Sequence, residues 1–282
     1  MHLIADSGSS KTDWRLLKDD NTIEQLKTSG INPYLISNKQ LLESLESDFK
    51  DRPLQNVHEI HFYGAGCGQQ KNKEKIKSVF SDFFKCQHIS VEDDMLAAAR
   101  ASCGNKEGII CILGTGANAC HYDGHRITNS MISLGYALGD EGSGAYIGKE
   151  TLKAYLENDM PEKLLKEFSR EFPAVTLEYA LEQIYQKPYP NRFFAQFFQF
   201  AFMHRKEKLF FDMIADAFQT FLNKSVLKFE QHPHLPVHFV GGVAFHANTI
   251  MRMVLTKNNL TAGNFMETPI AGLTLYHKNQ HQ

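Results

Sequence analysis

The sequence lacks the features of several large classes of protein. Its five cysteines form no Cys-x-x-Cys pair, which argues against a zinc knuckle or a disulfide framework. The formal net charge is only −2, and acidic and basic residues are interspersed along the chain. We therefore expect neither a nucleic acid nor a membrane as partner. The most aromatic run, at residues 193–202, is too short to span a bilayer. We expect a reduced, cytoplasmic protein.

The chain also lacks a low-complexity linker, but it contains an internal echo. Residues 3–14, LIADSGSSKTDW, read as a strand, a turn of small residues and a second strand. Residues 108–121, GIICILGTGANACH, repeat this plan, and a hairpin signal follows each copy. Two such copies about a hundred residues apart predict duplicated α/β domains.

The segments between and after the two copies alternate in character. Residues 38–50 and 71–85 have apolar positions at helical spacing, whereas EIHFYG and HISVE read as strands. After residue 143 the pattern is mainly helical, until VHFV at 237–240 predicts a last strand. This alternation favours a parallel or mixed sheet covered by helices.

The turn after Asp6 matches neither of two familiar phosphate loops. A Walker loop needs a Gly-Lys-Ser/Thr triplet, whereas Lys11 follows a serine. A dinucleotide fingerprint needs three glycines and an immediate helix, whereas this turn has only Gly8 and leads into a strand. The stretch predicts a β-hairpin whose tip is either an anion nest or a plain tight turn.

Three small-residue turns and one longer motif resemble a known family. The turns lie at 6–12, 114–118 and 241–242, in the order seen in the sugar kinase/Hsp70/actin superfamily. Residues 134–148, LGYALGDEGSGAYIG, resemble the signature of the BadF/BcrA-type ATPase and N-acetylglucosamine kinase family. The resemblance implies an α/β protein with two ribonuclease-H-like domains of the actin-like ATPase fold and an interdomain cleft for nucleotide and sugar. We expect a homodimer with ATP and Mg²⁺ as cofactors.

The domain boundaries follow from the echo and the resemblance. We expect residues 1–107 to form the N-terminal domain, and 108–267 the C-terminal domain with a helical insertion. A final helix at about 268–282 is expected to join the first domain, as in the family.

The resemblance also places the nucleotide and its metal. Asp6 would bind Mg²⁺ through water, and the hydroxyl of Ser10, at the end of the first turn, would contact the γ-phosphate. Lys11 adds positive charge there, although a solvated lysine fits the sequence equally well. The residues expected to bind ATP and its phosphates are Gly8, Ser9, Ser10, Lys11, Thr12, Gly114, Thr115, Gly116, Gly241 and Gly242.

The expected catalytic base lies where HISVE runs into an alanine-rich helix. Transfer of a phosphoryl group to a hydroxyl needs a carboxylate that accepts the hydroxyl proton. Asp94 aligns with the catalytic aspartate of the N-acetylglucosamine kinases, but a helix N-cap is an alternative role for it. A slip of one residue would exchange its role with that of Asp93.

The sugar positions come from the same resemblance. Asn32, in Gly-Ile-Asn-Pro, would hydrogen-bond sugar hydroxyls, and Tyr34 would supply an aromatic ring. Glu141 is expected at the sugar or, instead, as a cap of the next helix with Ser143. The full set of expected substrate-binding residues is Asn32, Asp94, Ser133, Leu134, Gly135, Asp140 and Glu141.

The sequence therefore predicts an ATP-dependent kinase for an N-acetylated amino sugar, N-acetylglucosamine first, with a 6-phosphate product. One alternative is a BadF/BcrA-type activator ATPase with an iron–sulfur cluster, but the Cys-Ala-Ala-Gly-Thr-Gly-like segment of the activators is missing at 111–116. Another is a nucleotide-dependent regulator without catalysis, against which the sugar-binding polar groups argue. The cysteine-rich zinc motif of ROK-type glucokinases is also missing.

Overall fold

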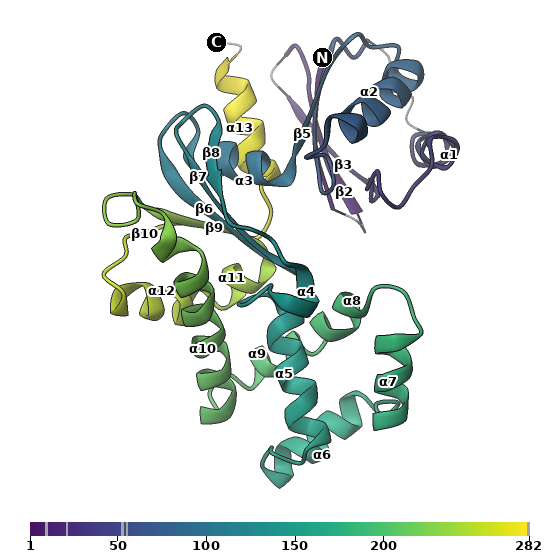
Figure 1. Ribbon diagram of the computed structural model, residues 1–282. Coiled ribbons are helices and arrows are strands. Elements are labelled where there is room, and N and C mark those ends of the chain that lie inside the picture. The colour runs from purple at the N-terminus through teal and green to yellow at the C-terminus, as the bar shows by residue number, and fades with distance from the viewer. Residues whose placement is uncertain (9–10, 21, 52–53, 55, 281–282) are drawn as a thin grey trace. The chain divides into compact units, whose positions relative to one another are not determined.

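The computed structural model describes residues 1–8, 11–20, 22–51, 54 and 56–280 (Figure 1). The chain divides into two compact units. Unit 1 comprises Met1–Lys106 and Thr268–Gln282, and unit 2 comprises Glu107–Glu267. Each unit contains one five-stranded sheet.

The sheet of unit 1 has the order β3-β2-β1-β4-β5. The strand β1 pairs antiparallel with β2 and parallel with β4, and β5 continues the parallel part. The polar end of β1 therefore lies beside the ends of β4 and β5. The strands are β1 (His2–Ser7), β2 (Lys11–Leu17), β3 (Ile23–Ser29), β4 (Glu59–Gly64) and β5 (His88–Asp93).

Helices cover both faces of this sheet because its central strands are apolar on both sides. Leu3 packs into an aromatic core around Trp14, beneath α1 (Asn38–Asp48) and α2 (Gln70–Phe84). Ile4 faces the other way, into a smaller cluster with residues of α3 (Asp94–Cys103) and α13 (Ile270–Gln280). The C-terminal helix α13 is thus part of unit 1.

The sheet of unit 2 repeats the strand order of unit 1. Its order is β10-β9-β6-β7-β8, with β6 antiparallel to β7 and parallel to β9. In both units the first strand is central, the hairpin strands lie on one side of it, and the two later strands lie on the other. The strands are β6 (Gly108–Leu113), β7 (Ala117–Tyr122), β8 (Ile127–Ser130), β9 (Val237–Val240) and β10 (Ala262–Met266).

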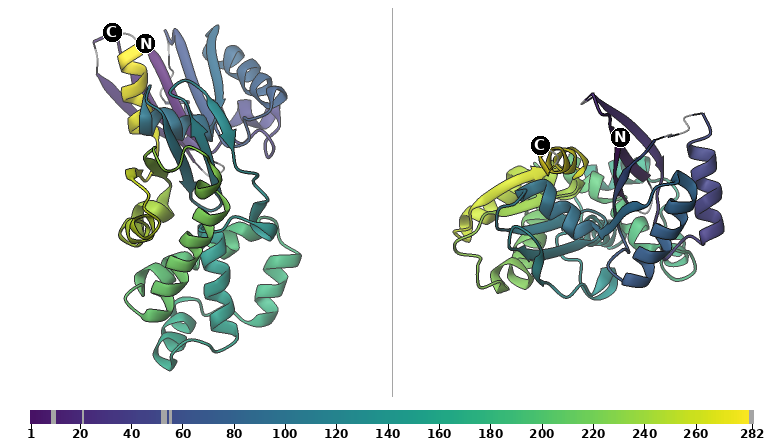
Figure 2. Two further views of the ribbon diagram at one scale, coloured as in Figure 1. Left: turned by 60° about the vertical axis from the view of Figure 1, so that its left-hand side comes forward. Right: turned by 90° about the horizontal axis from the view of Figure 1, so that it is seen from above.

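The insertion between β8 and β9 is helical, as the pattern after residue 143 predicts (Figure 2). A single large core, rich in phenylalanine, joins these helices to the sheet. Within the described residues, no helix is both long and apolar enough to cross a membrane. The helices of unit 2 are α4 (Gly135–Leu138), α5 (Gly144–Leu156), α6 (Glu162–Glu171), α7 (Leu177–Tyr185), α8 (Pro190–Ala195), α9 (Phe198–Met203), α10 (Lys208–Lys224), α11 (Gly242–His246) and α12 (Asn248–Lys257), with a 3₁₀ turn at Val226–Lys228.

The contact between α5 and α8 depends on Gly148. A Cβ at this position would lie 1.9 Å from the carbonyl oxygen of Phe194. We expect Gly148→Ala to lower the free energy of unfolding by about 1–3 kcal/mol, because the two backbones must separate. Urea unfolding followed by circular dichroism measures this. Gly68→Ala is the control, since a Cβ there meets nothing within 4 Å; equal stability of the two variants would contradict the expectation.

Candidate functional site

Two aspartates of unit 1, Asp13 and Asp94, raise the pKa of a third, Asp6. Asp6, near the end of β1, lies directly opposite Asp13 of β2. Burial, then the charges of Asp13 and Asp94, raise the pKa of Asp6 to about 7, while Lys11 lowers it. Asp13 is itself balanced by the ammonium groups of Lys11 and Lys27, whose Nζ atoms lie 3.6 and 3.7 Å from its carboxylate oxygens.

The structure separates the roles of the two neighbouring aspartates at the start of α3. Asp93 is the N-cap, and its carboxylate accepts a 2.8 Å hydrogen bond from the backbone N–H of Leu96. Asp94 is the first residue of the helix. Burial and the nearby charge of Asp93 raise the pKa of Asp94, although backbone N–H groups at Asp94 and Met95 lower it. The pKa of Asp94 is therefore raised overall, and its carboxylate is not the one that caps the helix.

The mutual repulsion of these carboxylates suits a cation. Burial and two like charges disfavour an ionised Asp6, and a divalent cation beside it would offset that cost. Among the described residues, no three His, Cys, Asp or Glu side chains form a metal-holding group. Mg²⁺ often has one or two carboxylate ligands and takes the rest from phosphates and water. The residues present fit that kind of site, with Asp6 as the protein group.

The hydroxyls of the first hairpin serve the interior of unit 1. Ser7 Oγ lies 2.7 Å from Thr12 Oγ1 and accepts a 2.9 Å hydrogen bond from the backbone N–H of Ile31. Thr12 Oγ1 donates to the carbonyl oxygen of Ser29 at 2.9 Å. Ser7 and Thr12 are both buried. Their hydroxyls therefore fix the backbone at Ser29 and Ile31, just before Asn32.

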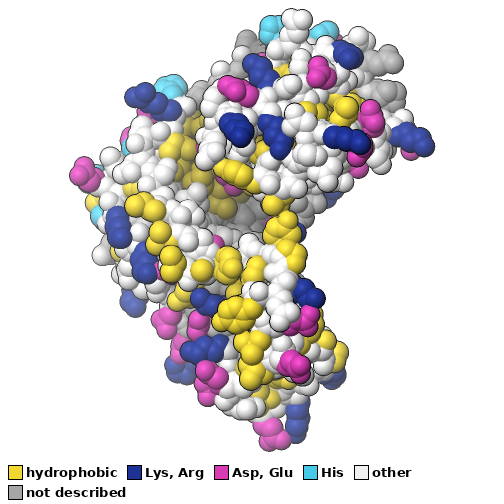
Figure 3. Space-filling view, turned by 45° about the vertical axis from the view of Figure 1, so that its right-hand side comes forward, with side chains coloured by type: hydrophobic (Ala, Val, Ile, Leu, Met, Phe, Trp, Pro, Cys, Tyr) yellow, Lys and Arg dark blue, Asp and Glu magenta, His cyan; other side chains and the backbone are white. Residues whose placement is uncertain are grey.

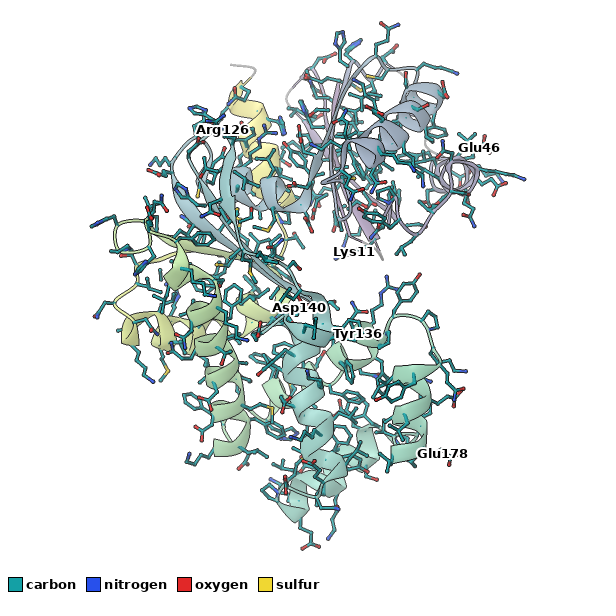
Figure 4. All side chains as sticks on the ribbon, in the orientation of Figure 1. Lys11, Glu46, Arg126, Tyr136, Asp140 and Glu178 are labelled. Carbon is teal, nitrogen blue, oxygen red and sulfur yellow. The ribbon has the colours of Figure 1, made fainter. Side chains whose placement is uncertain are left out.

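Not every expected residue of this hairpin is placed. Ser9 and Ser10 lie outside the described residues. The backbone N–H of Gly8 donates to the carbonyl oxygen of Lys11 at 3.0 Å and closes the turn. The Lys11 side chain is exposed, near the start of β2 (Figure 4). Of the residues that the sequence predicts for phosphate binding in this hairpin, Gly8, Lys11 and Thr12 lie in the described part of the chain.

The turn at Gly114–Gly116 in unit 2, the second turn for which the sequence predicts phosphate binding, is held by backbone hydrogen bonds. The N–H of Gly114 donates to the carbonyl oxygen of Gly116 at 3.0 Å. The N–H groups of Gly144 and Ala145, in the first turn of α5, donate to the carbonyl oxygens of Gly114 and Thr115. The side chain of Thr115 is exposed, so it can contact a ligand while the backbone holds the turn.

Asp140 connects this turn with the Gly-Asp-Glu-Gly-Ser motif. One of its carboxylate oxygens accepts a 3.3 Å hydrogen bond from the N–H of Ala117. A Cβ on Gly116 would lie 3.1 Å from the other oxygen. Burial raises the pKa of Asp140, and its φ of 59° is in the left-handed region. Asp140 therefore lies against the backbone of the phosphate turn.

Glu141, next in the motif, lies in an ion pair with Lys224 of α10, with 2.6 Å between its Oε1 and Nζ. The capping of α5 falls to Ser143, whose Oγ accepts from the N–H of Tyr146. The expected pairing of Glu141 with Ser143 as a cap is thus replaced by Ser143 alone.

Gly241 is required at the third turn for two reasons. Its φ is +116°, and a Cβ would lie 2.4 Å from the carbonyl oxygen of Leu113. The close approach brings the start of α11 against the end of β6, so Gly242 and the second phosphate turn border one cavity.

That cavity, of about 430 Å³, includes residues that the sequence analysis did not assign to a site. Gly114, Thr115, Gly144 and Gly242 form its backbone side. Its remaining lining comes from α8, α9 and α11 and is mostly apolar: Ala195, Phe198, Gln199, Phe202, Met203, Val243 and His246. Several of these residues belong to the aromatic run at 193–202. In the sequence, this run was considered only as a possible membrane span.

The expected sugar contacts of unit 2 lie on another side of the motif. Leu134, Asp140 and Glu141 border a second cavity, of about 360 Å³. Ser133 and Leu134 are exposed and Gly135 is partly exposed, at the start of α4. Tyr136 belongs to α4 and Asp140 follows this helix in the chain (Figure 4). Apolar side chains reach the surface here too, as in other parts of unit 2 (Figure 3): Ile132 is 81% exposed and Leu138 75%.

Comparison with known proteins relates the chain to one family and several solved structures. The model of the BadF/BadG/BcrA/BcrD ATPase family matches residues 5–274. A candidate N-acetylglucosamine kinase from Porphyromonas gingivalis is 39% identical, with a TM-score of 0.94 over 100% of both chains. A candidate N-acetylglucosamine kinase from Chromobacterium violaceum is 18% identical, with a TM-score of 0.72 over 98% of both chains. No protein with a curated description matches the sequence.

A ROK family glucokinase from Streptomyces griseus, in complex with glucose and AMPPNP, shares the fold at 13% identity. Its TM-score is 0.56, over 99% of this chain and 98% of the glucokinase. Together with the two sheets of equal strand order, these structures confirm the predicted fold class of two ribonuclease-H-like domains of the actin-like ATPase type.

The raised pKa of Asp6 gives a pH dependence of stability. A carboxyl whose pKa is higher in the folded state destabilises the fold as pH rises from about 4 through 7. We expect Asp6→Asn to gain about 1–3 kcal/mol of unfolding free energy over the wild type between pH 5 and pH 8, without Mg²⁺. Urea unfolding at both values measures it. Asp82→Asn, an exposed site on α2, is the control, and a gain that does not grow with pH would contradict the assignment.

Proposed function

Since the chain belongs to the BadF/BadG/BcrA/BcrD ATPase family, we propose that it is a kinase that transfers the γ-phosphoryl group of ATP to an N-acetylated amino sugar. N-acetylglucosamine is the proposed acceptor and its 6-hydroxyl the proposed site. The relative at 39% identity, a candidate N-acetylglucosamine kinase, supports this substrate. The observation that carries the proposal is a basic Asp94 carboxylate beside an Asp93 that already caps the helix.

Asp94 acts as the general base in this proposal. A carboxylate whose pKa is raised accepts a proton more readily than an ordinary one. The acceptor hydroxyl would pass its proton to Asp94 as its oxygen attacks the γ-phosphorus, and ADP would leave. The position of Asp94 at the N-terminus of α3 favours the ionised form that the reaction needs.

The phosphate groups of ATP are assigned to the backbone turns and to Asp6. The turn at Gly114–Gly116 offers an exposed Thr115 hydroxyl and glycines that let phosphate oxygens approach closely. Gly8 and Lys11 contribute the described part of the first turn. Mg²⁺, when bound with ATP, supplies positive charge for the phosphates, and Asp6 is the residue that would hold it through water.

The cavity of about 430 Å³ is proposed to bind the nucleoside part of ATP. Its size falls in the range of small-molecule sites. Phe198, Phe202 and Met203 supply apolar surface for a base, while Gln199 adds an amide that can both donate and accept. Gly242 borders the same cavity, which supports the ATP contact that the sequence predicts for Gly241 and Gly242.

The acceptor sugar is assigned to Asn32 in unit 1 and to Ser133, Leu134, Gly135 and Asp140 in unit 2. Asp140 has one oxygen committed to Ala117, so the other is the atom proposed for a sugar hydroxyl. Thr12 and Glu141 are left out of the ligand contacts, because their side chains bond within the protein.

The cysteines argue against an activator with an iron–sulfur cluster. Cluster ligands must be thiolates. Cys111 is fully buried in the core of unit 2, and burial raises its pKa well above the usual range. Burial also raises the pKa of Cys103 to about 12. The Cys111 thiol therefore cannot reach a cluster outside the core of unit 2.

The proposed base can be tested with two neighbouring substitutions. We expect Asp94→Asn to lower kcat for N-acetylglucosamine at least about a hundredfold, because an amide accepts no proton. Asp93→Asn is the matched control and should keep most activity, since asparagine also caps helices. A coupled ADP-release assay with Mg-ATP measures both. ADP release that does not depend on any amino sugar would refute the kinase.

The nucleoside cavity can be tested on α9. We expect Gln199→Ala to raise the KM for ATP about three- to tenfold, because a hydrogen bond to the base is lost, and to leave the KM for the sugar unchanged. Gln196→Ala is the control: Gln196 is also exposed, but it does not line the cavity. Equal effects of the two substitutions on the KM for ATP would contradict the proposal that this cavity binds the base.

A further inference from the structure

The helix α2 makes contacts with two loops of unit 1, at residues 64–68 and 31–36. Asn72, buried on α2, donates from its Nδ2 to the carbonyl oxygen of Gly66 at 2.8 Å. Lys75, one turn later on α2, donates from its Nζ to the carbonyl oxygens of Pro33 (2.8 Å) and Ile36. One face of α2 therefore holds the backbone of the Gly-Ala-Gly-Cys-Gly loop at 64–68 and that of segment 31–36.

The two loops also meet each other at Gly66. The φ of Gly66 is +85°, and a Cβ there would lie 2.8 Å from Asn32 Oδ1 and 2.9 Å from the ring of Tyr34. Asn32 Oδ1 in turn accepts a 3.1 Å hydrogen bond from the backbone N–H of Tyr34. The Asn32 side chain and the Tyr34 ring thus rest on the bare backbone of Gly66.

The contacts of Lys75 differ from those of an ordinary surface lysine. Its neighbour Lys73 pairs with the carboxylate of Glu92 at the end of β5, whereas Lys75 turns its partly buried ammonium to two neutral carbonyls. A lysine side chain loses rotamer freedom in such a contact. The gain is the fixed backbone between Pro33 and Ile36, next to Asn32.

We propose that Asn72 and Lys75 are positioning residues for the acceptor sugar, acting through Gly66 and segment 31–36. This inference rests on the proposed function, in which Asn32 binds a sugar hydroxyl. Neither α2 residue touches the sugar. They fix two loop backbones, and the loops fix the amide of Asn32 and the ring of Tyr34, which is 61% exposed. A small displacement of a group that positions a reactant costs binding and rate.

The first test compares two lysines of α2. We expect Lys75→Met to raise the KM for N-acetylglucosamine on the order of tenfold, since two charge-assisted hydrogen bonds are lost. The KM for ATP should stay within twofold, and kcat should change much less than the sugar KM. Lys75→Arg should recover most of the loss, because it keeps a cationic donor. Lys77→Met, at an exposed site on the same helix, is the matched control.

The second test compares two glycines of the loop. Gly66→Ala should also raise the sugar KM on the order of tenfold, because the methyl group would displace Asn32 and Tyr34. Gly68→Ala should not, since a Cβ there meets nothing within 4 Å. If Lys75→Met does not fold, as judged by its thermal unfolding, the glycine pair decides the same question.

The outcomes distinguish the inference from the function beneath it. A wild-type protein without sugar-dependent ADP release overturns both. A wild-type kinase whose sugar KM is unchanged in Lys75→Met and Gly66→Ala overturns the positioning role alone. So does a variant in which the KM values for ATP and sugar rise together, because that marks a general loss of structure.

Discussion

The crowding of carboxylates at the end of β1 is the constraint on which the chemistry of unit 1 depends. Asp6 faces Asp13 across the hairpin and also interacts with Asp94. Three negative charges in a partly buried place are costly unless something offsets them. Lys11 and Lys27 form ion pairs with Asp13. The charge of Asp6 is offset either by protonation or by a bound cation. The pKa of Asp94 is raised for a different reason, by burial and by the charge of Asp93 beside it.

Unit 2 offers a place for an anion that is built from backbone groups rather than from charged side chains. Backbone N–H groups at the start of α5 donate to the carbonyl oxygens of its turn at Gly114–Gly116, and Asp140 accepts a hydrogen bond from Ala117 directly after this turn. An anion can be held by such a turn without a lysine beside it, because backbone N–H groups and close approach supply the attraction.

Much of this could be predicted from short-range pattern. The hairpin echo and the alternation of strands and helices follow from periodicity, and the resemblance to a known family implies the fold class. The roles of Ser7, Thr12 and Glu141 could not be predicted, because hydroxyl and carboxylate side chains bind ligands or brace a loop equally well, and their partners Ile31 and Lys224 are distant in sequence. The cavity beside α9 was missed for a related reason: an aromatic run gives no sign of which rings line a cavity.

The sequence by itself determined which residues stand at strand ends and turns, since apolar spacing and small residues act over a few positions. Only the tertiary structure showed that Asp93, and not Asp94, caps α3, because a cap is defined by the donor it meets, here the N–H of Leu96. It alone brought Asn72 and Lys75 to the loops at 64–68 and 31–36. Such contacts depend on how helices pack on a sheet, and no local pattern in the chain encodes that packing.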